Sequence, residues 1–447
     1  MQDSTLTSEK GAPTVAHPTF REAFNVWMKI GLLSFGGPTG QIALMHRMLV
    51  EERHWIDDGR FLNALNFCML LPGPEAMRLA TYIGWRLHGI RGGLAAGLLF
   101  VLPGAAVVLT LSMIYAAFGQ VPVIEALFFG VKAAVLVVVI EALLRVAKRA
   151  LKGTEYWLLA AFSFVGIFFF AAPYPLLVLA STAVGYALTL RKGERGSVAP
   201  PVTAPVHGVA LFETLSTAAL WLAIWLGPLV AVAAIFGKGS VLAQIGYFFS
   251  KLAVVTFGGA YAVLAYMGQD VSSQYGWITP GEMMDGLGLA ETTPGPLILV
   301  TQFVGYLAAY RHGGAGPSVT MGLLGAVVTL WATFAPCFLW VFTGAPYLEW
   351  LNKQPRLKGA LAGVTAAVVG VILNLALWFG LHVIFKTVRL TTWGPLKLWT
   401  PDVATVDWRI IALTAISAFL LLWRHWNIMA VLAVAGGGAL ALRLAGI

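Results

Sequence analysis

The sequence predicts an all-α, polytopic membrane protein built from two homologous repeats, the second inverted relative to the first. Three observations support this prediction. The composition is 59% hydrophobic and 11% charged, whereas soluble domains carry about 25% charged residues. Apolar stretches of about twenty residues, long enough to form membrane-spanning helices, recur along most of the 447 residues. One set of motifs also occurs twice at a constant spacing.

The first repeat is expected over residues 20–190, after a polar tail at 1–19. The tail lacks the apolar core of a signal peptide, so we expect a disordered cytoplasmic segment. Glycine and proline interrupt the first two apolar segments, near 20–50 and 61–87. Four uninterrupted segments follow, near 93–118, 122–147, 155–171 and 174–190.

A polar, proline-rich stretch at 191–206 indicates a linker, and one additional apolar segment follows near 213–236. We assign residues 191–242 to this connection and residues 243–447 to the second repeat. Each repeat has six apolar segments. The single additional segment therefore turns the second repeat upside down, an arrangement typical of secondary transporters.

The duplication is visible in motifs that return at a constant offset of 222 in the numbering. The matched runs are Ser34–Gly37 with Thr256–Gly259, Trp55-Ile56 with Trp277-Ile278, and Pro72–Pro74 with Pro294–Pro296. Between Ser34 and Pro74, more than a quarter of the positions are identical at this offset. Further along the offset becomes 233, which aligns Gly130 with Gly363. A constant register across turn residues indicates an internal repeat.

Loop charge predicts the orientation of the first repeat. Lysine and arginine gather near 47–60, 86–91, 145–152 and 191–195, and the positive-inside rule places these loops in the cytoplasm. Each interrupted segment would then enter and leave on the same face. Re-entrant hairpins fit this requirement better than broken full spans, and both remain open. Basic residues on the opposite face of the second repeat weaken its assignment: Lys386, Arg389, Lys397 and Arg409.

The interruptions are candidates for an anion site made of backbone. Non-helical backbone inside a membrane is tolerated where it is buried in protein or lines a cavity. A proline after the break suits the first turn of a new helix, whose N–H groups and positive dipole end attract anions. Four such ends would bind substrate through Gly36, Gly37, Pro38, Gly73, Pro74, Gly258, Gly259, Gly295 and Pro296. The alternative is that these residues only kink ordinary spans.

Polar side chains near the breaks add to this candidate site. Arg78 lies four residues after Pro74 and would contribute N–H donors to the bound anion. Gln302, near the start of the equivalent half-helix in the second repeat, is a candidate polar ligand. Glu75 is a favourable acid at a helix N-terminus, the partner of Arg78, or a protonatable coupling group.

Charged residues within apolar segments are candidates for coupling transport to an ion gradient. Lys29 and Lys251 are equivalent at the offset of 222, and Lys132 lies near the start of an uninterrupted span. The alternative for these lysines is that the side chains reach the membrane surface. The first repeat carries more charge, because Thr365 stands where the first repeat has Lys132.

Two acids complete the coupling candidates. Glu141 is either a proton carrier or a packed acid paired with Arg145, its neighbour one helical turn later. Its equivalent in the second repeat is Asn374. Glu291 precedes the second proline–glycine–proline motif and is a candidate for the same role.

Several other functions lack the motifs that they require. The sequence has no Walker A motif, no metal-ligand spacing among its eight histidines and no nucleophile–base constellation. We therefore expect no metal, no cofactor and no enzymatic activity, which argues against a membrane-embedded enzyme. Cys68 and Cys337 lie in apolar runs and do not suggest a disulfide framework. The sequence shows no soluble basic face, so we expect no nucleic-acid partner.

Four runs resemble the chromate transporter family, namely Ser34–Pro38, Glu51–Ile56, Leu71–Ala76 and Ala80–Trp85. Thr256–Ala260 and Thr293–Pro296 are similar to the second domain of its long, two-domain members. The resemblance implies a multi-pass protein of the bacterial inner membrane that exports chromate or a similar oxyanion and confers chromate resistance. The driving force would be the membrane potential or the proton gradient.

Two alternatives to active export remain, a passive sulfate or chromate channel and an uptake carrier. The expected partners are the oxyanion substrate and the lipid bilayer, with the chain acting alone or as a homodimer. The motif residues after Pro296 depart from the first repeat, because Leu297-Ile298 replaces Glu75-Ala76. The assignment of charged site residues therefore rests mainly on the first repeat.

Overall fold

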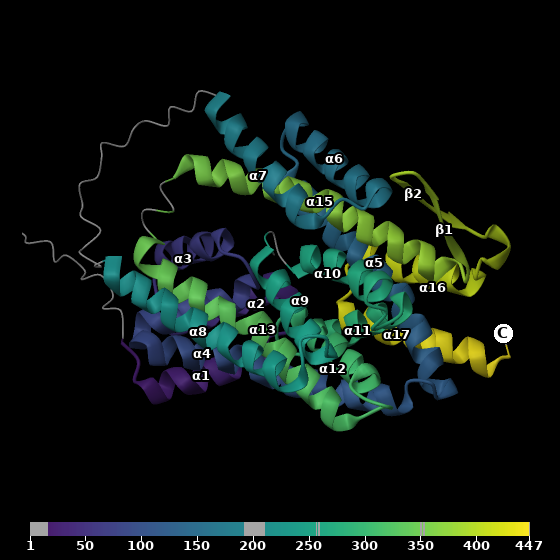
Figure 1. Ribbon diagram of the computed structural model, residues 1–447, viewed down its shortest axis with the longest axis horizontal. Helices are drawn as coiled ribbons and strands as arrows, with labels where there is room; N and C mark the ends of the chain where they lie inside the picture. Colours follow the sequence, from purple (N-terminus) through teal and green to yellow (C-terminus); the bar gives the residue numbers. More distant parts are fainter. Residues whose placement is uncertain are drawn as a thin grey trace, which may run out of the picture.

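The computed structural model describes residues 17–191, 211–255, 257, 260–348, 351 and 354–446. Most of the expected tail and of the linker lies outside these residues. The described chain is helical apart from one β-hairpin, and most of its long helices follow the long axis of the molecule (Figure 1). Five of the described helices are long and apolar enough to cross a membrane. The chain is thus a multi-pass membrane protein, as predicted.

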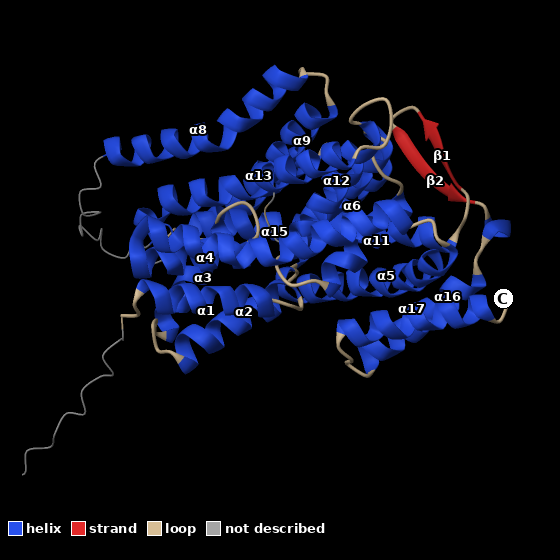
Figure 2. Cartoon of the chain, turned by 90° about the horizontal axis from the view of Figure 1, so that it is seen from below, coloured by secondary structure: helices blue, strands red, loops and turns tan. Residues whose placement is uncertain are grey.

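The helices of the first repeat begin and end close to the predicted breaks. They are α1 (Phe20–Leu33), α2 (Gly37–His46), η1 (Arg47–Glu52), α3 (Asp58–Leu70), α4 (Glu75–Phe118), α5 (Pro122–Ala150), α6 (Thr154–Phe170) and α7 (Tyr174–Arg191). Thr19 and Glu22 form a capping box that starts α1, and the Asp57 carboxylate caps α3. The additional helix α8 (Leu211–Phe236) lies along the outside of the bundle (Figure 2).

The second repeat reproduces this order. Its elements are α9 (Val241–Val255), α10 (Ala260–Gln269), η2 (Asp270–Gln274), α11 (Pro280–Thr292), η3 (Leu297–Leu299), α12 (Val300–His312), α13 (Val319–Gly344), η4 (Ala345–Tyr347), α15 (Pro355–Ile384), β1 (Val388–Trp393), β2 (Leu396–Pro401), η5 (Val403–Thr405), α16 (Trp408–Ala418), η6 (Phe419–Trp423) and α17 (Ile428–Leu444). The starts of α9, α10 and α11 match those of α1, α2 and α3 to within a single position at the offset of 222. The structure therefore has two repeats with interrupted helices.

The interrupted segments form helical hairpins. Helix α4 folds back on itself at His88 and Gly89, which have non-helical dihedrals, so its first half packs antiparallel on its second half. The ring of Phe20 at the start of α1 lies 5.6 Å from the ring of His88, and Arg53, which follows η1, acts electrostatically on Glu22 of α1. Both hairpins of the first repeat therefore open on one face, as the loop charge favours.

The two repeats are inverted relative to each other. The second half of α4 and its equivalent α13 run antiparallel, with Phe342 against Gly93 and Phe338 against Gly97. The repeats also exchange their central helices, because α5 packs on α16 and α17 while α15 packs on α6 and α7.

One pair of equivalent glycines marks this exchange. Gly130 of α5 lies directly against the Ala435 backbone, and Gly363 of α15 lies against the Ser181 backbone, with no room for a side chain at either position. Small residues allow such close helix packing in membranes.

A β-hairpin was not predicted. Strands β1 and β2 pair antiparallel between α15 and α16, at the end of the molecule where the C-terminus also lies (Figure 1). The hairpin carries Arg389 and Lys397, and Asp407 at the start of α16 forms an ion pair of 2.7 Å with Arg409. The basic residues that weaken the topology assignment thus belong mainly to this folded element.

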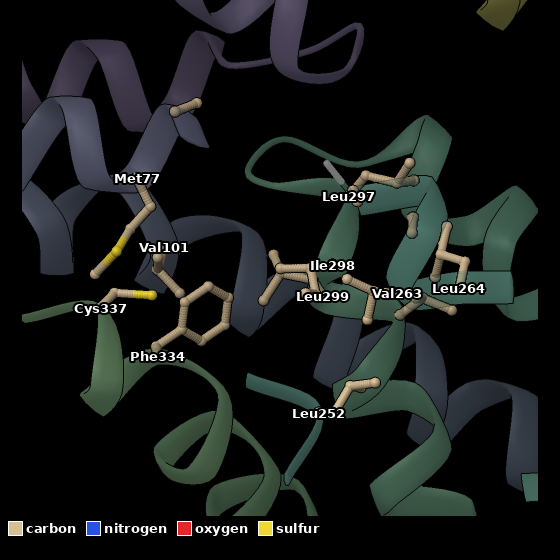
Figure 3. Packing of buried hydrophobic residues seen from close by; sticks show 14 of the residues in the cluster. Met77, Val101, Leu252, Val263, Leu264, Leu297, Ile298, Leu299, Phe334 and Cys337 are labelled. Atoms are coloured by element: carbon tan, nitrogen blue, oxygen red, sulfur yellow. The ribbon is translucent and has the colours of Figure 1, made fainter. Parts of the chain in front are cut away.

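The break of the second repeat at Pro294–Pro296 lies in the packed middle of the molecule. Leu297, Ile298 and Leu299 of η3 are buried between Phe334 of α13 on one side and Val263 of α10 on the other (Figure 3). This interruption is therefore enclosed by protein, where irregular backbone is tolerated at membrane depth.

Candidate anion-binding site

One small pocket of the described chain is bordered by residues that follow all four breaks. The space in it that a water-sized molecule can reach is only about 10 Å³, and its lining residues are Pro38, Gln41, Pro74, Glu75, Ala76, Ala260, Pro296, Leu297 and Ile298. They come from the first turn of α2, the first turn of α4, the start of α10 and the start of η3. The inverted repeats therefore bring four helix starts to one place.

Glycines give the breaks their shape. Gly36 and Gly37 have φ values of 84° and 70°, and Gly73 and Gly295 have values of 106° and 93°. Only glycine adopts such angles without strain. The equivalent residues Gly73 and Gly295 share one conformation, so the repeat extends to the backbone of the break. Gly258 and Gly259 lie outside the described residues.

Hydrogen bonds across the repeats hold the pocket together. The Gly295 N–H donates to the Ser34 carbonyl over 2.8 Å. The buried Gln41 amide donates to the Gly295 carbonyl over 2.7 Å and to the Ser34 carbonyl over 3.4 Å. Gln41 was not singled out from the sequence. The signal that could have revealed it is a lone amide in a short half-helix, one turn after a break.

Arg78 differs from its prediction. Its buried guanidinium donates to the carbonyls of Leu71, Gly73 and Pro74, which follow the C-terminus of α3. Its donors are thus directed at the break around Pro72–Pro74, and Arg78 is absent from the pocket lining. We assign Arg78 as a positioning residue that caps the break. Its positive charge still lies one helical turn from the pocket, where a low dielectric extends its influence.

Glu75 lines the pocket, and the structure bears on the three interpretations of this residue. Among the described residues, an ion pair with Arg78 is not found, because that guanidinium is occupied by carbonyls. Glu75 begins α4, where the helix dipole favours an acid. The remaining interpretations are a favourable N-terminal acid and a protonatable group facing the substrate.

A second polar cluster lies beside the pocket. The Tyr261 hydroxyl donates to the buried Glu291 carboxylate over 2.7 Å, and Tyr261 follows Ala260 of the pocket lining. Glu141 forms an ion pair with Arg145, as the local interpretation of that residue predicts. Arg145 and Glu141 both act electrostatically on Glu291. The cluster thus joins α5, α10 and α11.

The other predicted polar residues lie away from the pocket. Lys29 and Lys251 are exposed on α1 and α9, and the Lys251 ammonium lies 5.6 Å from the centre of the Tyr266 ring. These positions fit side chains that reach the surface. Gln302 is buried in α12 and is not part of the lining. Lys132 pairs with Asp285, a residue that the sequence analysis missed.

The chain is similar to proteins described as chromate transporters. The chromate transporter family model matches residues 21–186 and 243–442. The chromate transport protein of Pseudomonas aeruginosa is 33% identical over 374 residues, with 82% of each chain covered. The chromate transport protein of Cupriavidus metallidurans is 31% identical over 370 residues, which cover 81% of this chain and 82% of the relative.

A more distant relative spans more of the sequence. An uncharacterized transporter of Methanocaldococcus jannaschii is 25% identical over 419 residues, which cover 93% of this chain and 92% of the relative. No solved structure matches the chain significantly. The two regions of the family match coincide with the two structural repeats.

Proposed function

The chain belongs to the chromate transporter family, and we propose that it is a secondary active transporter that exports chromate or a similar oxyanion across the bacterial inner membrane. The observation that carries the proposal is the convergence of four helix starts on one pocket between inverted repeats. Secondary transporters place substrate sites at such repeat interfaces, with interrupted helices pointing at the ligand.

The electrostatics of the pocket favour an anion. Helix starts at Pro38 and Pro74 direct backbone N–H groups and positive dipole ends towards it. The buried Arg78 adds a positive charge beside the pocket, where the Glu75 carboxylate acts on it electrostatically without a direct ion pair among the described residues. We propose that Gly36, Gly37, Pro38, Gly73, Pro74, Gly258, Gly259, Gly295 and Pro296 form the backbone frame of the substrate site.

Acids near the pocket supply candidates for energy coupling. Glu75 lines the pocket itself, so an ionised Glu75 would repel an incoming oxyanion. Glu291, with Glu141 and Arg145 beside it, lies at the end of α11 just before the break at Pro294–Pro296. We propose that proton binding to these acids accompanies movement of the anion, while the hairpins alternate between the two faces.

Chromate flux in everted membrane vesicles tests the proposal. Wild-type vesicles are expected to accumulate labelled chromate against its gradient, and an uncoupler should abolish the accumulation. Competition by molybdate and sulfate would rank the substrates. Arg78→Ala is expected to lose uptake, with Arg409→Ala, at the distant end of the molecule, as the matched control. Flux that only equilibrates chromate would establish a channel, and the absence of flux would reject chromate as substrate.

A further inference from the structure

Asp285 is a buried acid that the proposed substrate site does not use. It lies in the middle of α11 and is 3% exposed. The Tyr115 hydroxyl donates to its Oδ2 over 2.8 Å, and the Lys132 ammonium lies 3.4 Å from the same oxygen. Its Oδ1 is buried and has no hydrogen-bond partner among the described residues. One carboxylate oxygen is thus doubly held, while the other is free to carry a proton.

Positive and negative side chains surround Asp285, and some of them reach the solvent. Lys132 comes from α5 and Tyr115 from the end of α4. Glu282, one turn earlier on α11, also acts on Asp285, and its charge is compensated by Arg311 of α12 at 3.0 Å. The side chains of Lys132 and Arg311 are partly exposed. A proton can therefore approach from the face opposite the basic loops of the first repeat.

The cluster is absent from the equivalent place in the first repeat. Asn63 occupies the position of Asp285 on α3, and Thr365 occupies the position of Lys132 on α15. Both halves form the same hairpin without sharing this pair, so the hairpin fold does not require the ions. Because a charge at membrane depth is costly, we expect the Asp285–Lys132 pair to have a function besides folding.

We propose that Asp285 is a proton-binding site that controls release of the α11 hairpin from α5. A proton from the outer face converts the carboxylate to a carboxylic acid, and Lys132 keeps its own proton. The charge pair is thereby lost, and α11 is free to separate from α5 and open the pocket outwards. Loss of the proton restores the pair and closes the hairpin. This inference rests on the proposed transport function and assigns it a coupling residue.

Two assays on the purified full-length protein in liposomes separate the outcomes. The first measures exchange of labelled for unlabelled chromate at equal pH. The second measures chromate accumulation driven by an imposed pH difference, where about one unit supports roughly tenfold accumulation per coupled proton. Asp285→Asn resembles the protonated acid, so it is expected to retain exchange and lose driven accumulation.

Glu125→Gln is the matched control, since it neutralises an exposed acid on α5, the helix that carries Lys132, and it should retain both activities. Driven accumulation by Asp285→Asn at the wild-type level would overturn the inference. Wild-type protein that shows neither exchange nor accumulation would instead reject the proposed function.

A second variant covers the case in which Asp285→Asn does not fold. Lys132→Gln removes the positive partner and leaves the carboxylate, so proton binding becomes easier. The pH at which driven uptake is half-maximal is expected to move upwards by about one unit or more. Reduced uptake with an unchanged pH profile would mean that the pair is only structural, and this result would also overturn the inference.

Discussion

The hairpin of α3 and the first half of α4 has the same fold as the hairpin of α11 and α12 in the second repeat. The surroundings of the two hairpins differ. Leu62 of α3 is 46% exposed, whereas its equivalent Met284 of α11 is fully buried. Met69 is 48% exposed, whereas its equivalent Glu291 is 6% exposed. Helix α3 packs mainly on α4, but α11 packs on α5, α12, α15 and α17.

The difference suggests how one unit can have two states. Gly73 and Gly295 both have a positive φ at equivalent breaks, and the hairpins differ there only in that the short 3-10 turn η3 precedes α12. What also differs is whether the hairpin rests against the central helices α5 and α15. A hairpin that is packed on one face and released on the other is the arrangement expected of alternating access. On the proposed transport function, we infer that the structure corresponds to a state closed at the second repeat.

The largest predicted effect is a difference in stability between variants at two equivalent breaks, Pro72–Pro74 and Pro294–Pro296. Arg78→Ala would leave the carbonyls of Leu71, Gly73 and Pro74 without their donor, at a cost of about 3–5 kcal/mol. Val300 occupies the equivalent position of the second repeat, and Val300→Ala is the matched control. Thermal unfolding in detergent measures both. Equal unfolding temperatures for the two variants would contradict the role of Arg78 in holding the first break.

The next effect concerns the bond between the repeats. Gln41→Leu removes the donor to the Gly295 carbonyl and should cost about 1–3 kcal/mol. Because Gln41 also lines the pocket, KM for chromate is expected to rise more than kcat falls. Val263→Ala alters the equivalent side chain in the second repeat and should leave KM within twofold of wild type. An unchanged KM in Gln41→Leu would show that the bond does not shape the site.

A third prediction concerns Gly73 and Gly295, the equivalent glycines at which the two repeats are alike. Alanine at Gly73 or at Gly295 would be forced into a left-handed conformation, which costs about 1–2 kcal/mol. The new methyl group would also meet the Cys337 sulfur at 3.2 Å or the Leu299 side chain at 3.0 Å. Similar losses of stability are therefore expected for the two variants. A loss confined to one variant would mean that the breaks are not equivalent.

The smallest effect is a pH dependence at the end of the first hairpins that loop charge predicts to be cytoplasmic. The His46 ring lies 2.7 Å from Asp58 and 3.0 Å from Glu51. The hydrogen bond to Asp58 raises the pKa of His46, despite slight burial, and Glu51 acts in the same direction. This stabilisation is fully present below the unfolded pKa of about 6.5. It is lost as the pH rises through the higher folded value.

Because these groups are largely solvated, the change should be about 0.5–1 kcal/mol. His46→Gln is expected to flatten this part of the stability profile, measured as unfolding temperature against pH. The equivalent residue of the second repeat is Gly268, so its hairpin offers no such dependence. A profile that is unchanged in His46→Gln would show that His46 does not cause the pH dependence.

The sequence revealed the scaffold better than the polar contacts. Glycine, proline and the constant register predicted the repeats, their breaks and the inverted arrangement. Arg78 was predicted to donate to the anion, but its donors turn towards nearby carbonyls, which depends on how tightly the chain closes at Pro72–Pro74. Asp285 was missed because its partners Tyr115 and Lys132 come from α4 and α5, in the other repeat and far away along the chain. Glu141 and Arg145 were predictable because their contact is local.

The most direct test of alternating hairpins is disulfide crosslinking at equivalent pairs, with Cys68 and Cys337 replaced by alanine. Gly288 packs against Val131 in this structure, and Asn66 and Val364 are the equivalent residues of the other half. Cysteines at positions 288 and 131 are expected to crosslink at rest and to block transport until reduced. Cysteines at 66 and 364 are expected to crosslink only while chromate and a proton gradient drive turnover. Transport that continues with the first pair crosslinked, or a second pair that never crosslinks during turnover, would contradict the alternating hairpins.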